Sequence, residues 1–218
     1  MFRVFILVVF AIICAPFTAM AEGGGPFGIF LSEITRLKEN PQGRISASGT
    51  MRIKEGKYSG LSEFVIETGC GGYRVKSGKN ELLNDGEFNY IVDSSSREVT
   101  ITFFDSGSRS VLANPLALLF ELPEGFDIVK EEVSEDGYEV SLVPATKDTG
   151  LSFLNLTIAP DGKSLSALGF EVLYDSSKTV VSIDVDSFSF SGSAPGSEDF
   201  TPDLVSLEEE GYFINDLR

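Results

Sequence analysis

Histidine and tryptophan are absent from this sequence of 218 residues, and only two residues are cysteine. The absence of histidine excludes a Ser-His-Asp triad and any metal site with imidazole ligands. Cys14 lies in the N-terminal segment 1–21, and Cys70 is the only cysteine of residues 22–218, so it has no partner there for an internal disulfide. It also has no histidine base to activate it as a nucleophile. The sequence therefore indicates a binding protein and not an enzyme, with no metal and no cofactor.

Basic residues are scarce as well: 17 lysines and arginines stand against 33 acidic residues, which gives a net charge of −16. Nucleic acids and acidic membranes are therefore poor partners, because binding phosphate needs clustered basic side chains. A basic protein surface remains compatible. Carboxylate pairs such as Asp184 and Asp186, or Glu131 and Glu132, could do acid–base chemistry on a sugar. In so acidic a chain such pairs are expected by chance, and we interpret them as solvated side chains.

The N-terminus has the features of a secretory signal peptide. A basic start, Met1-Phe2-Arg3, precedes an uninterrupted apolar run from Val4 to Ile13. Pro16 breaks the run, and Ala19-Met20-Ala21 fits the small-x-small pattern that precedes a signal-peptidase site. The run is shorter than the ~20 residues that span a bilayer. We therefore expect export with cleavage after Ala21, and one mature domain over residues 22–218.

From about residue 43 to residue 190, apolar and polar residues alternate in short bursts separated by turn residues. Such alternation is typical of strands with one apolar face. In the first burst, Ile45, Ala47, Met51 and Ile53 share that face. Short connections such as Asn84-Asp85-Gly86 favour antiparallel neighbours. The predicted strands cover residues 44–54, 60–68, 72–77, 87–93, 98–104, 126–130, 137–144, 151–158, 167–174 and 179–190.

Two segments depart from the strand pattern. Apolar residues recur at helical spacing between residues 28 and 40, and Pro41 ends that predicted helix. Residues 111–121 are nearly all apolar, and Asn114 can cap a helix that has Pro115 at its first position. This short helix could be an ordinary part of the core or a hydrophobic lid. Residues 191–209 are acidic and loop-like, whereas the tail over residues 213–218 is apolar enough to dock.

About ten strands and few helices predict a mainly β (α+β) fold. A sheet of this size cannot stay flat and has to curl. With helices on its concave side, a curled sheet forms an apolar pocket, which is the common form of a ligand site. Composition and pattern thus lead to a curved antiparallel sheet whose apolar face binds something.

The order of elements resembles the periplasmic outer-membrane lipoprotein carrier family (LolA-like). Gly49-Thr50-Met51-Arg52-Ile53-Lys54 is similar to a strand motif of that family, and Asn84 to Tyr90 is similar to its Asp-Gly-x-x-aromatic-x-aromatic hairpin. Asn114-Pro115-Leu116-Ala117-Leu118-Leu119 resembles its lid helix. Residues 126–144 resemble its hairpin that ends in Leu-x-Pro, and Asn215-Asp216-Leu217-Arg218 is similar to the ending of many Bacteroidetes members. The resemblance spans residues 28–218.

The resemblance implies a half-open barrel of antiparallel strands, with an N-terminal helix and short helices covering the concave hydrophobic face. It implies a periplasmic carrier that holds the acyl chains of lipoproteins, or a related lipid, and shuttles them toward the outer membrane. The implied partners are an inner-membrane lipoprotein-releasing transporter and an outer-membrane acceptor, and we expect a monomer. The alternative is a regulatory domain on the same half-barrel that senses lipids or lipoproteins in the cell envelope.

Two departures from the family pattern stand out. Val65 takes the place of an arginine that helps to govern cargo release, and the family's tryptophans are missing. From the resemblance and the alternation we predict two sets of site residues, each of which could also be plain core. The lid set is Leu112, Leu116, Leu119 and Phe120. The acyl-chain cavity set is Met51, Ile53, Phe64, Ile66, Phe88, Tyr90, Ile101, Phe103, Leu154, Leu156 and Phe170.

Overall fold

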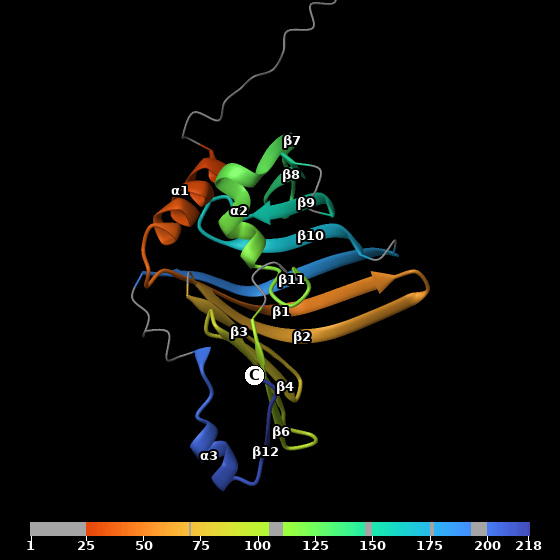
Figure 1. Cartoon of the computed structure of the whole chain (residues 1–218). Coiled ribbons are helices and arrows are strands. Elements are labelled where there is room, and N and C mark those ends of the chain that lie inside the picture. Colours follow the sequence, from red (N-terminus) through yellow and green to blue (C-terminus); the bar gives the residue numbers. More distant parts are fainter. Residues whose placement is uncertain (1–24, 70, 105–110, 147–149, 175–176, 193–199) are drawn as a thin grey trace, which may run out of the picture.

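The computed structural model of the protein describes residues 25–69, 71–104, 111–146, 150–174, 177–192 and 200–218 (Figure 1). The predicted signal peptide lies outside these ranges. The helices are α1 (Pro26–Lys38), α2 (Ala117–Gly125) and α3 (Leu204–Glu209). The strands are β1 (Arg44–Glu55), β2 (Tyr58–Gly69), β3 (Gly72–Ser77), β4 (Asn80–Asn84), β5 (Phe88–Asp93), β6 (Glu98–Phe103), β7 (Phe126–Val133), β8 (Tyr138–Pro144), β9 (Leu151–Ile158), β10 (Leu165–Tyr174), β11 (Ser177–Ser191) and β12 (Phe213–Asp216).

The strands of the described ranges form one sheet in the order β12-β6-β5-β4-β3-β2-β1-β11-β10-β9-β8-β7. Neighbours are antiparallel, except that β12 runs parallel to β6. Two meanders, β1 to β6 and β7 to β11, meet at the long β1–β11 pair. The end strands β12 and β7 do not pair with each other, so the curved sheet stays open. The predicted fold class, a curved antiparallel half-open sheet with few helices, is confirmed.

Helices α1 and α2 lie on one side of the sheet (Figure 1), which we call the helix face. The other side is the reverse face. Pro26 occupies the first position of α1, where its fixed φ and missing N–H are well suited. The side chains that α1 buries recur at helical spacing: Phe27, Phe30, Ile34 and Leu37. No helix within the described ranges is long and apolar enough to cross a bilayer.

The strand register decides which side chains of β1 meet the helices. Ala47 lies between Ile66 of β2 and Phe188 of β11, so apolar side chains of three neighbouring strands meet on the helix face. Residues two apart along a strand share a face. The register therefore confirms the predicted common face of Ile45, Ala47, Met51 and Ile53.

A β-bulge in β11 changes the phase of alternation along that strand. Ser48 pairs with Ser187, whereas the next residue, Gly49, pairs with Val185, so β11 has one extra residue at this point. As a result both Val185 before the bulge and Phe188 after it lie on the helix face. The bulge gives the last half of β11 a row of aromatic side chains under α1.

A second, smaller core lies on the reverse face of β4, β5 and β6. Its buried residues are Leu83, Tyr90, Val92, Val99 and Ile101. The C-terminal part of the chain covers it: α3 contributes Leu204 and Leu207, and β12 contributes Ile214. The Arg218 guanidinium lies 4.7 Å from the ring centre of Phe88. The sheet therefore buries opposite faces in its two halves.

Phe200 anchors the C-terminal segment near the centre of the reverse face. Its ring is 2% exposed, and the guanidinium of Arg44 lies 4.2 Å from the ring centre. A Cβ at Gly72 would come within 2.9 Å of this ring, so the glycine provides its space. Arg44 also forms an ion pair with Glu67 at 3.2 Å. The arginine that begins β1 thus fixes the segment that leads to the second core.

The Asn84-Asp85-Gly86 turn is held by the Asp85 carboxylate. It accepts hydrogen bonds from the amides of Glu87 (2.9 Å) and Phe88 (2.7 Å) and from the Tyr90 hydroxyl (2.8 Å). Burial alone would raise the pKa of Asp85, but these hydrogen bonds outweigh it and lower the pKa. Burial, followed by the hydrogen bond to Asp85, raises the pKa of Tyr90 to about 12. In the Asp-Gly-x-x-aromatic-x-aromatic pattern, the aspartate thus holds the turn, and the second aromatic residue supports that aspartate from the reverse face.

Two elements were not predicted. Strand β4 is a burst of five residues between two turn signals, too short to stand out by alternation. Helix α3 forms within a segment predicted to be a loop, because its partly buried residues, Leu204 and Leu207, make only one turn of helical spacing. Asp203 caps it by accepting a hydrogen bond from the amide of Ser206 at 3.1 Å. The predicted docking of the tail takes the form of β12.

Gly49 and Gly60 offer a matched test of the β1–β11 register. A Cβ at Gly49 would lie 2.0 Å from the backbone oxygen of Asp184, whereas a Cβ at Gly60 would mainly meet the side chain of Tyr58, which is exposed and can move. We expect Gly49→Ala to lower the free energy of unfolding by about 2 kcal/mol or more, and Gly60→Ala to change it by less than about 1 kcal/mol. Urea unfolding followed by circular dichroism measures both, and equal effects would contradict the register.

Candidate functional site

The largest buried cluster lies between the helix face and helices α1 and α2. Strands β1, β2 and β8 to β11 all contribute to it, which makes it the only core that both meanders share within the described ranges. Its buried sheet residues are Ile45, Ala47, Phe64, Ile66, Val140, Leu142, Leu154, Leu156, Ile158, Leu165, Leu168, Phe170, Val181 and Ile183.

The four predicted lid residues all belong to this cluster or pack against it. Leu116 and Leu119 are fully buried, and Leu112 and Phe120 are partly buried. Helix α2 begins at Ala117 and not at Pro115, so Leu112 and Leu116 lie in the turns before the helix. We call residues 111–125 the lid segment.

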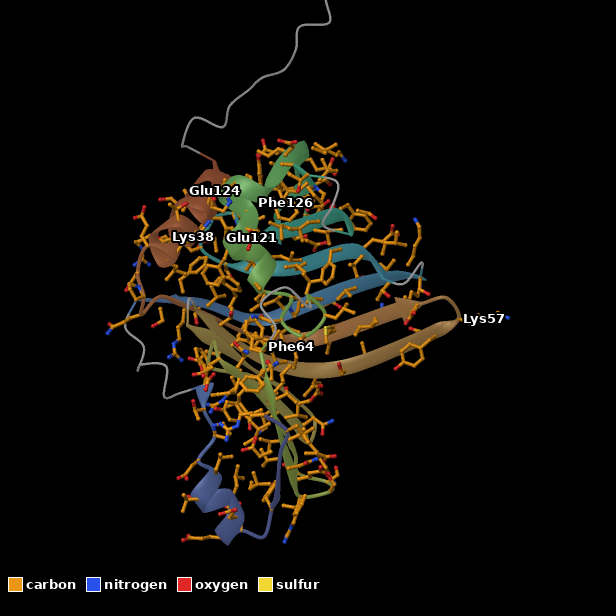
Figure 2. The ribbon with its side chains drawn as sticks, viewed as in Figure 1. Lys38, Lys57, Phe64, Glu121, Glu124 and Phe126 are labelled. Atoms are coloured by element: carbon orange, nitrogen blue, oxygen red, sulfur yellow. The ribbon has the colours of Figure 1, made fainter. Side chains whose placement is uncertain are left out.

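Seven of the eleven predicted cavity residues lie on the helix face, in the same cluster as the lid segment. Figure 2 shows one of them, Phe64, on β2 below α2. Five are buried and two, on β1, are partly buried at the margin of the cluster. These seven are Phe64, Ile66, Leu154, Leu156, Phe170, Met51 and Ile53.

The other four, Phe88, Tyr90, Ile101 and Phe103, lie on the reverse face. The helix face continues from Ile66 through Val75 and Leu82 to Ile91, because these residues pair across β2 to β5. Tyr90 is the neighbour of Ile91 and therefore points to the other side. Three of the four belong to the second core and Phe103 is 63% exposed. They do not share a site with the seven, because alternation does not say which face of a sheet a strand buries.

Val65 also lies on the reverse face. It stands between Phe64 and Ile66, whose side chains are buried on the helix face, and it is 55% exposed. Its partners across the ladder are Ser48 and Lys76. A side chain at this position therefore does not contact the lid segment, whatever its charge.

Helix α2 has little stability of its own. It has nine residues, no side chain caps its start, and Pro123 removes one hydrogen-bond donor from its interior. Glu121 and Glu124 lie near its C-terminal end, where negative charge opposes the helix dipole. Lys38 Nζ lies 3.4 Å from Glu124 Oε2 between α1 and α2 (Figure 2), but both side chains are exposed and such pairs contribute little. The helix is held mainly by the buried contacts of Leu118, Leu119 and Leu122.

A buried polar contact fixes the start of the lid segment. Asn114 does not cap α2. Its Nδ2 instead donates to Thr68 Oγ1 of β2 at 2.9 Å, with both side chains buried. The Asn114 Oδ1 atom is buried and accepts no hydrogen bond within the described ranges. An unsatisfied buried acceptor costs about 1–3 kcal/mol, so opening of the lid segment to water would relieve this strain.

An apolar rim extends the helix face beyond the helices, toward the β1–β2 turn that Lys57 marks in Figure 2. We define the rim as Met51, Ile53, Leu151 and Val172, which are partly buried and pack against the large cluster. Tyr58 lies farther along β2 on the same face and is 66% exposed. At the rim, apolar side chains of the helix face are in contact with solvent while α1 and α2 keep their positions.

The aromatic contacts under α1 were missed as part of the site. The ring centre of Phe30 lies 5.9 Å from that of Phe188 and 5.5 Å from that of Phe190. Regular alternation from Val181 through Val185 places Phe188 on the opposite face. Only the bulge brings it back to the helix face. The sequence contains Phe188 and Phe190, but without the bulge it does not predict that they share the helix face with Phe30.

The chemistry of the large cluster is that of an apolar binding surface. Its members are aliphatic, methionine and phenylalanine side chains, with Tyr138 at the edge. Burial raises the pKa of the nearby Tyr73 hydroxyl, which keeps it neutral. No group of three or more side chains suited to hold a metal ion occurs in the described ranges. Such a surface binds a ligand by removing apolar area from water.

No family model and no curated protein matches this chain. Among solved structures, an uncharacterized conserved protein from Thermus thermophilus is similar, with a TM-score of 0.48 and 11% identity over 85% of this chain and 97% of that one. The LolA superfamily protein NE2245 from Nitrosomonas europaea has a TM-score of 0.43 and 12% identity, over 80% of this chain and 97% of that one. A putative outer membrane lipoprotein-sorting protein domain from Vibrio parahaemolyticus has a TM-score of 0.39 and 11% identity, over 84% of this chain and 98% of that one.

A LolA superfamily protein is thus among the structural neighbours of this chain, as the resemblance in the sequence predicted. Membership of the Bacteroidetes-type group is not tested by these neighbours. The fold described above follows from the strand order and register of this chain itself.

Two phenylalanines on opposite faces test the placement of the cluster. Phe64 is 2% exposed on the helix face, whereas Phe103 is 63% exposed on the reverse face. We expect Phe64→Ala to lower the free energy of unfolding by about 3–5 kcal/mol and Phe103→Ala to lower it by less than about 1 kcal/mol. Urea unfolding of the two variants measures the difference. A larger loss at Phe103 would mean that the faces are assigned the wrong way round.

Proposed function

We propose that this protein carries the acyl chains of lipoproteins, or a related lipid, on its helix face. The observation that supports this most is the combination of a large apolar sheet face with a short, poorly stabilised helix as part of its cover. In the proposed cycle, the fully buried Leu116 and Leu119 correspond to a lid closed over the helix face. An acyl chain would enter at the rim and replace the lid segment on the helix face.

The free energy that holds the lid segment and the free energy that an acyl chain gains by burial are of similar size. Leu116, Leu118, Leu119 and Leu122 are buried, and each contributes about 1.5–3 kcal/mol, so the lid segment is held by about 6–12 kcal/mol at most. A buried methylene contributes about 0.8 kcal/mol, so eight methylenes of one chain contribute about 6 kcal/mol. A lipid with two or three chains can therefore displace the lid, and the lid can return when the cargo leaves.

The proposed setting is the periplasm. The signal peptide expected from residues 1–21 would deliver the chain there after cleavage behind Ala21, leaving residues 22–218 as one carrier domain. There a lipoprotein's acyl chains need shielding from water between two membranes. An inner-membrane releasing transporter would load the carrier, and an outer-membrane acceptor would empty it. These partners belong to the proposal.

A reversible disulfide tests whether the lid segment has to move. Asn114 and Thr68 meet through polar side-chain atoms 2.9 Å apart, which makes a cysteine pair at these positions the candidate bridge between β2 and the lid segment. Mass spectrometry of the oxidised variant verifies that the disulfide has formed. In a Cys70→Ser background, we expect the oxidised Thr68→Cys, Asn114→Cys variant to bind a fluorescent triacylated lipopeptide at least tenfold more weakly than its reduced form. Fluorescence titration of the two redox forms measures this.

The reduced form of the same variant is the matched control, because it carries both substitutions but leaves the lid segment free. The peptide without acyl chains is the second control and should not bind. Equal affinity of the oxidised and reduced forms would show that the lid segment does not cover the binding surface. Tight binding that persists in the presence of excess acceptor vesicles would instead favour the sensing alternative, because a carrier has to release its cargo.

A further inference from the structure

The edge strand β7 is open to solvent along almost its whole length. It is the last strand of the sheet order and pairs with β8 alone within the described ranges. Every residue after Phe126 is exposed, including the β-branched Val129 at 64% and Val133 at 83%. Natural edge strands are usually protected by lysine, proline or a bulge. Here the bulge lies near Val129, and the four residues after it pair regularly with β8; the single lysine among them, Lys130, is engaged by Glu132.

The hydrogen bonds of the β7–β8 hairpin show which amides of this edge face outward. The amide of Ser134 donates to the carbonyl of Gly137 at 2.8 Å, so this pair closes the hairpin. Bonded and non-bonded pairs alternate along an antiparallel ladder. The pair of Val133 and Tyr138 is then non-bonded, and so is the pair of Glu131 and Val140. The amides and carbonyls of Glu131 and Val133 therefore point away from β8 toward the open edge.

The charge along this edge excludes one obvious partner, a second copy of the chain. Glu131, Glu132, Glu135 and Asp136 are exposed at or just beyond the end of β7. The single lysine of the strand, Lys130, is paired with Glu132. Two β7 edges in antiparallel contact would bring these carboxylates together, and like charges directly opposite are destabilising. The same charges favour a strand that carries lysine or arginine.

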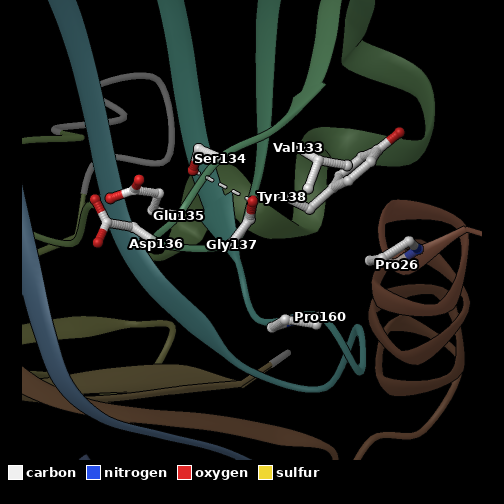
Figure 3. Close-up of a pocket in the computed structure, with 8 residues that line it drawn as sticks. All are labelled: Pro26, Val133, Ser134, Glu135, Asp136, Gly137, Tyr138 and Pro160. Carbon is white, nitrogen blue, oxygen red and sulfur yellow. Dashed lines mark hydrogen bonds between the residues drawn. The ribbon is translucent and has the colours of Figure 1, made fainter.

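A small apolar pocket adjoins the end of the edge (Figure 3). Its volume is about 230 Å³, and it lies between the β7–β8 turn, the start of α1 and the β9–β10 turn. Figure 3 shows Val133 and the ring of Tyr138 on one side of it, with Pro26 and Pro160 on the other. Burial, followed by the charge of Glu131, raises the pKa of the Tyr138 hydroxyl, so the carboxylate and the ring are close.

We propose that the β7 edge and this pocket form a docking site for an extended, basic segment of another protein. The segment adds to the sheet as a further strand beyond β7, with main-chain hydrogen bonds to Glu131 and Val133. It places a lysine or arginine opposite Glu131 and, two residues along, an apolar side chain opposite Val133 that enters the pocket. The pocket adjoins the large cluster at Tyr138, but strand pairing along β7 does not depend on the proposed carrier function.

Peptide binding to the full mature chain tests this site. The probe is a fluorescein-labelled peptide of sequence KTVTKTVT, which places alternating lysine and valine on one face of a strand. Its matched control is ETVTETVT. We expect the basic peptide to bind, with affinity falling as salt rises, and the acidic peptide not to bind. Fluorescence anisotropy measures both, and binding of neither peptide at millimolar concentration would overturn the proposal.

Two substitutions at one position separate backbone pairing from charge. Glu131→Pro removes an outward donor without removing a bond to β8, and we expect about tenfold weaker peptide binding. Glu131→Gln keeps the donor and should weaken binding only two- to threefold. Circular dichroism and urea unfolding confirm that each variant is folded. Three results would each overturn the proposal: equal affinity of Glu131→Pro and the parent chain, peptide-induced amide shifts by NMR that spare β7 and the pocket, or a dimer in sedimentation that Glu131→Pro dissolves.

Discussion

The contact between the lid segment and the helix face is the interaction on which the rest of this structure depends. The helix in that segment lacks a cap, contains Pro123 and carries glutamates at its C-terminal end. Its conformation therefore depends on leucines buried against the sheet, where a hydrocarbon chain could make similar contacts. Because dispersion and burial do not distinguish a leucine from an acyl chain, one surface can accept either.

The sheet that supplies this surface is not uniform. Over β1, β2 and β8 to β11 it buries the helix face, and over β4 to β6 it buries the reverse face, against which α3 packs. This division anchors the C-terminal segment on the face opposite the lid segment, through Phe200 and Arg44. The reverse-face core can stay intact while the lid segment moves. At the far edge, β7 remains free to meet another chain.

Much of the fold could be predicted from the sequence, because alternation and turn residues are local signals. The ten predicted strands and the N-terminal helix are all present, with ends shifted by a few residues. Local signals could not predict on which face of the sheet each strand buries its apolar side chains. Tyr90 and Phe64 stand in equally regular strands, yet their faces are opposite, since that depends on register across four strands. The bulge near Gly49 misled alternation in the same way for Phe188.

The lid shows the same limit on a smaller scale. The apolar run over residues 111–121 predicted a helix capped by Asn114 with Pro115 at its first position. The structure instead uses Asn114 to bind Thr68 of β2, and the helix begins later at Ala117. A side chain that can cap a helix can equally bond to a distant strand, and only the tertiary contact decides between them. The four predicted lid residues are nevertheless buried or partly buried in the large cluster, as apolar side chains usually are.

The most direct measurement of the central claim is the distance between the lid segment and the sheet in the empty and loaded protein. Nitroxide labels at Lys57→Cys, on the β1–β2 turn, and at Glu121→Cys, on α2, report it by pulsed electron spin resonance in a Cys70→Ser background. A second pair, Lys57→Cys with Ser32→Cys on α1, serves as the reference. We predict that a triacylated lipopeptide shifts the first distance distribution and leaves the second unchanged. A bound lipopeptide with both distributions unchanged would contradict the exchange of lid for cargo.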